Sequence, residues 1–310
     1  MNRHLSQYIL ICIGSLLLFS CTKEVDADLE DLSGRPVLNG LMRADTTLSV
    51  HLTRSKPVLG PGAQGAFDKI TDAQVWVYEN GVQKALSYNS QSNRYESSWK
   101  VLPGQNYRIQ AEIPGLSEPV FSGEEYLPQP VTIKSLSADS FIADGSLYLM
   151  VDFRFDDPPQ PGDFYHAVLF KRCYMSGEIS FQDYIDISYD LDNPLGSGNN
   201  ANASSYANVR YQDISYYHGV AFSDAEINGK EVRFTFPVNH SINGCDPGQG
   251  ELYLELRKCS KAYYEYINSV SQYQGSAGNP FGNPVQVYDN ITNGSGIWGG
   301  YSLRTRTFDL

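Results

Sequence analysis

The chain has 310 residues, and its 35 acidic residues against 23 Lys and Arg give a formal net charge of −12. Lys and Arg form no cluster along this acidic sequence, which argues against a nucleic acid as partner. The 22 Tyr and 14 Phe are spread with little helical periodicity, which favours β structure.

The first 20 residues have the pattern of an export signal. Arg3 is followed by a nearly unbroken apolar run at 8–19, shorter than the roughly 20 residues that span a bilayer. A basic start and a short apolar core predict a secretory signal peptide over residues 1–20. The sequence LFSC, which ends at Cys21, resembles a lipobox, where the leader is removed and the cysteine receives acyl chains. We therefore expect lipidation of Cys21; an ordinary signal peptide with an incidental cysteine is the alternative.

Residues 21–35 are predicted to form a lipidated, flexible tether. The stretch contains five acidic residues and few apolar ones, so it cannot bury enough surface to fold by itself. Its start, Lys23-Glu24 with Asp26 close by, resembles the charged signal that directs some lipoproteins to the outer face of the outer membrane. A merely solvated linker explains the same charges. The expected location is the outer membrane, through the lipid anchor, with the cell surface and the periplasmic face both open.

The segment 36–127 is predicted to be a transthyretin-like or immunoglobulin-like β-sandwich. Short apolar runs alternate with turn signals about every ten residues, as is typical of sandwiches. Asn80-Gly81 lies between two such runs and predicts a tight hairpin. In 105–113 alternate residues are apolar, which predicts a strand with one buried face. The order D-A-x-V-x-V-Y-E-N-G, then P-G-x-x-Y-x-I-x-A, resembles transthyretin-like and carboxypeptidase-regulatory-like sandwiches, which are usually spacers or docking modules.

The segment 128–310 is predicted to be a larger antiparallel β-domain with one packed helix. Apolar and polar residues alternate in 147–155, 232–238 and 252–256, which predicts strands with one buried face. The stretch 188–217 is rich in Gly, Asn, Ser and Tyr and predicts a long exposed loop, either functional or disordered.

The helix is predicted near 260–274. Ser260 is a suitable N-cap, and Tyr263, Ile267 and Val270 follow at helical spacing to make one apolar face. Its tyrosines admit two interpretations, a sugar-stacking surface or packing on a sheet, and packing is favoured.

Three cysteines remain once Cys12 leaves with the leader and Cys21 is acylated. The export compartment permits disulfides. Cys245 and Cys259 flank one predicted strand, which holds them too far apart to bond unless the strand is broken. Cys173 and Cys259 each end a strand and would be able to bond if the two strands ran side by side in the same direction. Three free thiols are the alternative.

The most specific pattern lies near the C-terminus. S-x-x-Y-Y-x-Y begins at Ser260, and G-N-P-F-x-x-P-V-x-V-Y-x-N-I-x-N-G-x-G-I-x-G-G-Y begins at Gly278. With the lipobox cysteine, V-D-x-D-L, P-V-L-N-G-L and H-L-T-R-S-x-P-V-L near the start, these residues resemble the domain of unknown function 4249 family over nearly the whole mature chain. The resemblance implies an outer-membrane lipoprotein of a Gram-negative group rich in TonB-dependent receptors, often encoded beside such a receptor. The family has no assigned activity, so the resemblance supplies no catalytic residue.

No catalytic or metal-binding motif is found in the sequence. The histidines show no metal-ligand spacing, and neither a nucleophile elbow nor a phosphate loop occurs. The glycines of the C-terminal pattern indicate tight turns or close backbone contact instead. We expect no catalytic residue, no metal and no cofactor.

Three functions are compatible with this sequence. The leading hypothesis is a non-catalytic outer-membrane lipoprotein that is an accessory or docking partner of a TonB-dependent transporter. The second is a cell-surface glycan- or protein-binding lipoprotein that uses Tyr206, Tyr211, Tyr216 and Tyr217 of the 188–217 loop. An uncharacterised enzyme is the third and the least favoured.

Replacing Cys21 by serine should abolish acylation, because the cysteine is the group that carries the acyl chains. The wild-type protein should enter the detergent phase in a Triton X-114 separation, and Cys21→Ser should stay in the aqueous phase or remain unprocessed. Cys12→Ser is the control, since Cys12 lies inside the leader and its loss should change nothing. Acyl mass found by mass spectrometry on the Cys21→Ser protein would contradict the anchor.

Overall fold

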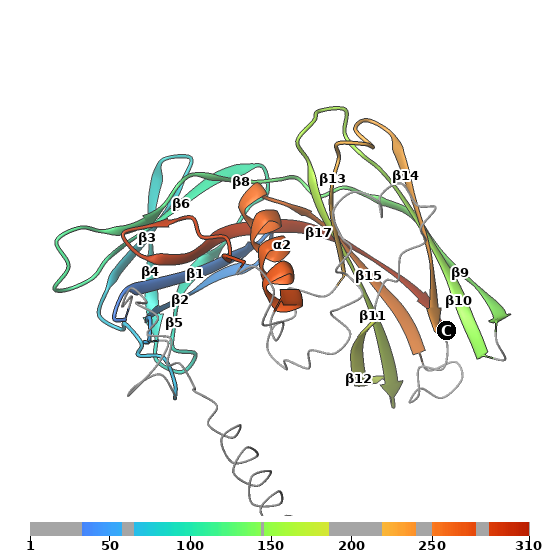
Figure 1. Ribbon diagram of the computed structural model, residues 1–310, viewed down its shortest axis with the longest axis horizontal. Helices are drawn as coiled ribbons and strands as arrows, with labels where there is room; N and C mark the ends of the chain where they lie inside the picture. The colour runs from blue at the N-terminus through green and yellow to red at the C-terminus, as the bar shows by residue number, and fades with distance from the viewer. Residues whose placement is uncertain are drawn as a thin grey trace, which may run out of the picture. The chain divides into compact units, whose positions relative to one another are not determined.

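Residues 33–57, 65–143, 146–185, 219–239, 250–276 and 285–309 are the part of the chain that the computed structural model describes. Within these ranges the chain forms 17 strands and one helix, α2 (Lys261–Ser276) (Figure 1). The predicted class, mainly β with one packed helix, is confirmed. The predicted signal peptide and all but the last residues of the predicted tether lie outside the described ranges.

The first eight strands build two facing layers. One layer contains β1, β2 and β5, the other contains β3, β6 and β7, and β4 pairs with both β5 and β3. The bounds are β1 (Pro36–Arg43), β2 (Thr47–Arg54), β3 (Gln74–Glu79), β4 (Val82–Asn89), β5 (Arg94–Lys100), β6 (Gln105–Glu112), β7 (Val120–Ser122) and β8 (Glu125–Leu127). Asn80 and Gly81 connect β3 to β4 with φ of 47° and 82°, the positive values that a two-residue hairpin turn requires. This part is the predicted β-sandwich.

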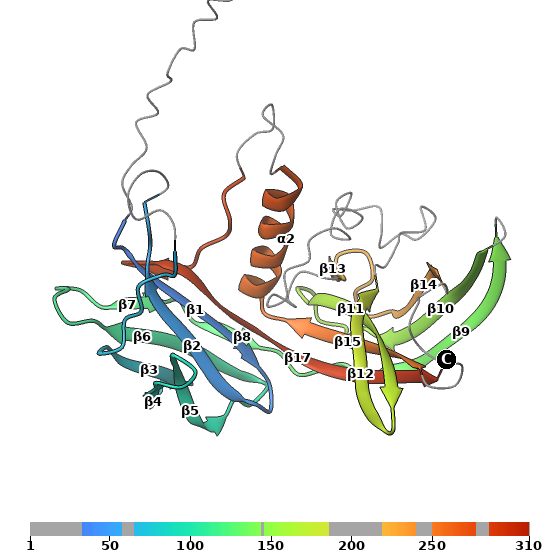
Figure 2. The same ribbon diagram turned by 90° about the horizontal axis from the view of Figure 1, so that it is seen from below.

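The later strands build the second part in three layers. The three-stranded sheet β14-β10-β9 packs on one face of β11, β15 and the end of β17, and α2 lies on the other face of the sheet to which these three strands belong (Figure 2). The bounds are β9 (Ile133–Ala143), β10 (Ser146–Asp156), β11 (Phe164–Met175), β12 (Glu178–Ile185), β13 (Val220–Ser223), β14 (Glu231–Asn239), β15 (Gly250–Cys259), β16 (Ile291–Thr292) and β17 (Ser295–Asp309). The alternation predicted from the sequence fills the core between the two sheets, with Phe153, Phe234 and Leu254 almost fully buried.

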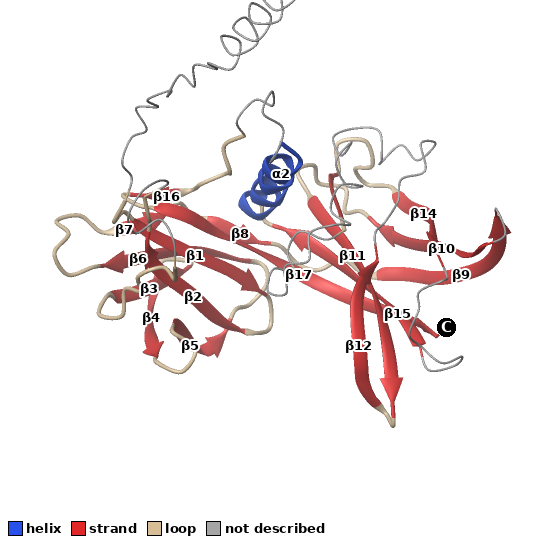
Figure 3. Ribbon diagram, turned by 60° about the horizontal axis from the view of Figure 1, so that its bottom comes forward, coloured by secondary structure: helices blue, strands red, loops and turns tan. Residues whose placement is uncertain are grey.

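Strand β17 runs through both parts of the chain (Figure 3). Its first half pairs in parallel with β1, from Val37↔Ser295 to Arg43↔Tyr301. Its second half pairs antiparallel with β15, as far as Glu251↔Asp309. One continuous sheet therefore includes strands from the sandwich and from the second part. The predicted boundary between 36–127 and 128–310 stays a prediction.

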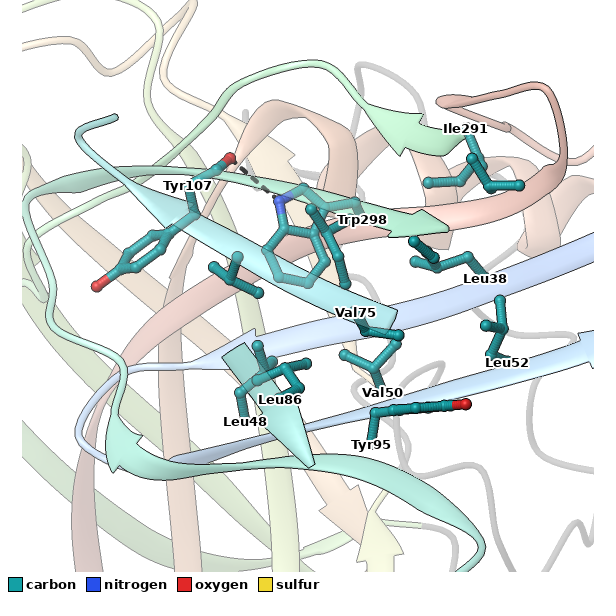
Figure 4. Packing of buried hydrophobic residues seen from close by; sticks show 14 of the residues in the cluster. Leu38, Leu48, Val50, Leu52, Val75, Leu86, Tyr95, Tyr107, Ile291 and Trp298 are labelled. Carbon is teal, nitrogen blue, oxygen red and sulfur yellow. Dashed lines mark hydrogen bonds between the residues drawn. The ribbon is translucent and has the colours of Figure 1, made fainter. Parts of the chain in front are cut away.

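Trp298 of β17 completes the core of the sandwich (Figure 4). Its side chain is 0% exposed among residues of β1, β2, β3 and β6, and its indole Nε1 donates a hydrogen bond of 3.1 Å to the Tyr107 carbonyl. Gly40 of β1 lies against it, and a Cβ at Gly40 would stand 2.8 Å from the indole ring. The indole thus takes the space that a side chain at Gly40 would otherwise fill.

Trp298→Ala should lower the free energy of unfolding by about 3–5 kcal/mol, because it leaves a large cavity in the sandwich core. Urea unfolding followed by circular dichroism measures the loss. Trp76→Ala is the matched control, since Trp76 is half-buried on the outer face of β3 and should cost far less. Equal losses in the two variants would contradict the central place given to Trp298.

Candidate functional site

The residues proposed for binding and anchoring fall outside the described ranges. Cys21 precedes Ser33, and Tyr206, Tyr211, Tyr216 and Tyr217 lie within 186–218. Lipidation and the tyrosine site therefore stay predictions. In the part of the chain that the structure covers, no helix is long and apolar enough to cross a bilayer.

The predicted disulfide between Cys173 and Cys259 is wrong. Strands β11 and β15 run antiparallel, with Phe164 opposite Cys259 and Cys173 opposite Gly250. The two cysteines thus lie at opposite ends of the pair, separated by nine residues of strand or roughly 30 Å. Cys173 is disulfide-bonded, and Cys259 is a buried free thiol. The prediction failed because it assumed that the strands run in the same direction.

The tyrosines at the start of α2 pack on the sheet. Tyr263 is 0% and Tyr264 8% exposed, and their rings lie 5.1 Å from Tyr301 and 4.7 Å from Phe164, respectively. Packing, the favoured interpretation, therefore holds for these two side chains. They are not available to stack against a sugar.

Beneath α2 the sheet contains a buried charge network. Arg257 of β15 donates to Glu255 through Nε (3.0 Å) and Nη2 (2.5 Å), and to the Tyr263 hydroxyl through Nη1 (3.1 Å). The same hydroxyl lies 3.1 Å from Nδ1 of His166. The guanidinium also stands 4.8 Å from the centre of the Tyr301 ring. Arg257 is therefore bound to β15, to α2 and to β17 at once.

The pKa values of three groups in this network are raised further above neutral pH. Burial raises the pKa of Tyr263 well above its usual value and raises that of the Cys259 thiol as well. Burial opposes the charge of Arg257, but Tyr263, Tyr301 and Glu255 together raise its pKa. A neutral buried thiol is a poor nucleophile, and a tyrosine that does not ionise is a poor base. The contact between Arg257 and Tyr263 thus attaches the helix to the sheet.

The residues of the C-terminal pattern form the junction between helix and strand. The Ser260 hydroxyl accepts from the backbone N–H of Tyr263 (3.3 Å) and of Gly300 (3.1 Å), so it caps α2 and binds β17 together. A Cβ at Gly299 would stand 2.9 Å from the Tyr263 nitrogen. Asn290 extends the junction, because its side chain donates to the Trp298 carbonyl (2.7 Å) and accepts from the Trp298 N–H (2.8 Å). The predicted close backbone contact is therefore found.

The N-terminus of α2 is also filled by a carboxylate. Glu125 of β8 accepts from the Ala262 N–H at 3.4 Å, where the helix dipole favours negative charge. Burial raises the pKa of Glu125, and its bonds to the helix end oppose that rise. With Ser260 and Glu125 in place, this helix end is occupied by the protein's own groups.

Three carboxylates lie close together beside the first residue of β11, and the spacing of these residues in the sequence did not reveal them. Oxygens of Asp157, Asp163 and Asp224 lie within 4.8 Å of one another. Asp224 accepts from the N–H of Asp163 (3.0 Å), and Asp157 accepts from Tyr165 (2.5 Å). Lys258 supplies a positive charge 2.6 Å from Asp163. The cluster joins two loops, and no signal in the separate stretches 157–163 and 224 would have linked them.

A pocket of about 360 Å³ opens at the turn between β6 and β7. Its lining includes Asp72, Glu112 and Glu118, whose side chains are all exposed to solvent. It is thus an open depression, unlike the water-excluding cavities in which enzymes strengthen electrostatic effects.

Arg257→Met should lower the free energy of unfolding by about 3–5 kcal/mol, because it leaves the Glu255 carboxylate buried without its cation. Arg257→Met combined with Glu255→Leu should recover most of that loss. Urea unfolding of both single variants and the double variant gives the coupling energy.

Lys134→Met provides the control for that cycle, because Lys134 pairs with Asp156 on the surface and should cost less than about 1 kcal/mol. A coupling energy near zero between Arg257 and Glu255 would show that the buried pair does not act as a unit.

Comparison with known families shows which family the chain belongs to. Residues 22–307 match the model of a domain of unknown function, DUF4249, which covers nearly the whole chain. No curated protein matches the sequence. The chain therefore belongs to the domain of unknown function 4249 family.

Proposed function

We propose that this protein is a non-catalytic outer-membrane lipoprotein that acts as an accessory or docking partner of a TonB-dependent transporter. The observation that carries the proposal is that the residues of the C-terminal family pattern have structural roles. Ser260, Asn290 and Gly299 hold the helix, the strand and the sandwich together. The most distinctive residues of the chain thus specify a scaffold.

The titratable groups near that junction support the same conclusion. Arg257 is engaged by Glu255 and Tyr263, and burial keeps the Cys259 thiol neutral. These engaged groups support a role that the protein performs through its surface. Partner binding is the function that such a scaffold serves best.

The predicted anchor makes weak binding sufficient. A lipid chain on Cys21 would hold the protein in the same membrane as its partner, so the encounter takes place at high effective concentration. Interfaces of modest affinity then become occupied. The family resemblance, with its frequent gene neighbours, points to a TonB-dependent receptor as that partner.

Affinity purification of the tagged protein from detergent-solubilised outer membrane tests the proposal. A TonB-dependent receptor should co-purify in near-equal amount, as identified by mass spectrometry. Deleting the gene for this protein should also reduce uptake through that receptor.

A Cys21→Ser version tests whether receptor binding depends on the membrane anchor. It should recover much less receptor, since the effective concentration is lost. A protein recovered alone, together with unchanged uptake after deletion, would overturn the proposal.

A further inference from the structure

A buried amine lies against the three carboxylates beside the first residue of β11. Lys258 of β15 is paired in register with Tyr165 of β11, and its Nζ stands 2.6 Å from Oδ2 of Asp163. Oxygens of Asp157 and Asp224 lie within 4.8 Å of an oxygen of Asp163 and of each other. We call Lys258 and these three acids the amine–carboxyl cluster.

The amine–carboxyl cluster is shielded from water. Asp157 and Asp224 are 4% and 3% exposed, and the side chain of Lys258 is 10% exposed. Tyr165 is fully buried beside the cluster, with its ring 5.1 Å from that of Phe155 in the core. Lysine amines that are held out of water next to a proton acceptor act as nucleophiles in proteins. The surroundings of Lys258 are therefore those of a reactive amine.

The contact between Lys258 and Asp163 differs from an ordinary ion pair. Oδ2 of Asp163 is buried and accepts no hydrogen bond from any residue that the structure describes, although the amine is 2.6 Å away. By contrast, Lys134 donates a regular hydrogen bond to Glu231 at the same distance. The angles at the buried contact are thus not those of a hydrogen bond. Packing, rather than a hydrogen bond, holds the Lys258 amine against the carboxyl group.

The other two carboxylates differ in their hydrogen bonds. Asp157 accepts from the Tyr165 hydroxyl through Oδ1 and from the Gly229 N–H through Oδ2. Asp224 accepts from the N–H of Asp163 through Oδ2. Within the described part of the chain no donor reaches Oδ1 of Asp224, so this oxygen is the one able to take up a proton.

We propose that Lys258 and Asp163 condense to form an isopeptide bond, which links β15 covalently to the start of β11. Nζ of Lys258 forms a bond to Cγ of Asp163, and one Cγ–O bond of Asp163 breaks. Two of the three ammonium protons pass through Asp224 to the departing oxygen, which leaves as water, and the third stays on the amide nitrogen. An ammonium and a carboxylate thus become an amide and water, without an oxidant or a further reactant.

The charges in the cluster favour Asp163 as the group that is attacked. Burial raises the pKa of Asp163; Lys258 opposes this rise, and Asp157 and Asp224 add to it. A carboxyl group in such surroundings takes up a proton readily, and the protonated form is the one that reacts with an amine.

Proximity makes the condensation favourable. Free amines and acids form little amide in water, but two groups held together by a fold reach effective concentrations of about 10⁵–10⁸ M. The register of β11 and β15 supplies this proximity, since it places Lys258 next to Tyr165. Exclusion of water also protects the amide from hydrolysis.

The link would fix the strands on which α2 lies. Asp163 is next to Phe164 and Lys258 is next to Arg257, and both of these neighbours contact the helix. The bond also closes the long stretch of chain between residues 163 and 258 into a loop. Cross-links that close long loops stabilise a fold by restricting its unfolded chain.

Intact mass spectrometry tests the inference on residues 22–310, made without acyl chains and measured after reduction of disulfides. The folded protein should be lighter than its sequence by one water molecule. A tryptic digest should contain a branched peptide in which Lys258 is joined to Asp163. Lys258→Arg keeps the positive charge beside Asp163, but a guanidinium does not lose its proton to become a nucleophile. This variant should therefore have the full mass of its sequence.

Lys134 provides the matched control in the same molecule. Its amine also stands 2.6 Å from a carboxylate, that of Asp156, but the two side chains are 43% and 59% exposed. The digest should contain no branched peptide at Lys134. Asp224→Asn should be mostly unlinked when the wild-type protein is fully linked, because loss of a proton relay slows such a reaction about 100-fold or more.

Full sequence mass in the folded wild-type protein, or loss of water that persists in Lys258→Arg, would overturn the inference. A fully linked Asp224→Asn protein would overturn the role of Asp224 as the relay. Circular dichroism of each variant confirms that it is folded. The measurement involves neither membrane nor receptor, so its failure leaves the proposed transporter role standing.

Discussion

Strand β17 has to satisfy three neighbours at once, and this requirement determines much of the structure. It lies parallel to β1, antiparallel to β15, and directly beneath the start of α2. Side chains would prevent two of these approaches: a Cβ at Gly296 would meet the Leu38 carbonyl of β1 at 2.1 Å, and one at Gly299 would meet the Tyr263 nitrogen of α2 at 2.9 Å. Glycine costs conformational entropy in a strand, and here it is the residue that lets both β1 and α2 approach the backbone of β17.

Features that depend on neighbouring residues were visible in the sequence. Alternation predicted β6 and β10, and the pair Asn80-Gly81 predicted the hairpin. Features set by long-range register were not. Trp298 has no local signal that assigns it to a core built mainly from residues before 128, and the failure at Cys173 and Cys259 came from an unknown strand direction. The three meeting carboxylates are of the same kind, because they are assembled from distant segments.

The buried polar groups explain how a single helix is held on a broad sheet. Arg257 has little freedom, since Glu255, Tyr263 and the Tyr301 ring surround its guanidinium. Buried ion pairs contribute little net stability, but they penalise any arrangement that separates the partners. The helix is thereby attached in one position, with Ser260 and Gly299 fixing its first turn against the strand.

The position of Trp298 near the C-terminus also governs the order in which the protein can mature. A ribosome releases residues 36–127 long before it reaches 298, and at about 5–20 residues per second the interval is roughly 10–30 s. During that time the sandwich lacks its central indole and the partner strand of β1, so apolar surface is left uncovered. The sandwich of the nascent chain therefore stays unfinished until β17 emerges. The sandwich core is completed only when β17 arrives, so its stability depends on a strand that is synthesised more than 150 residues after β8.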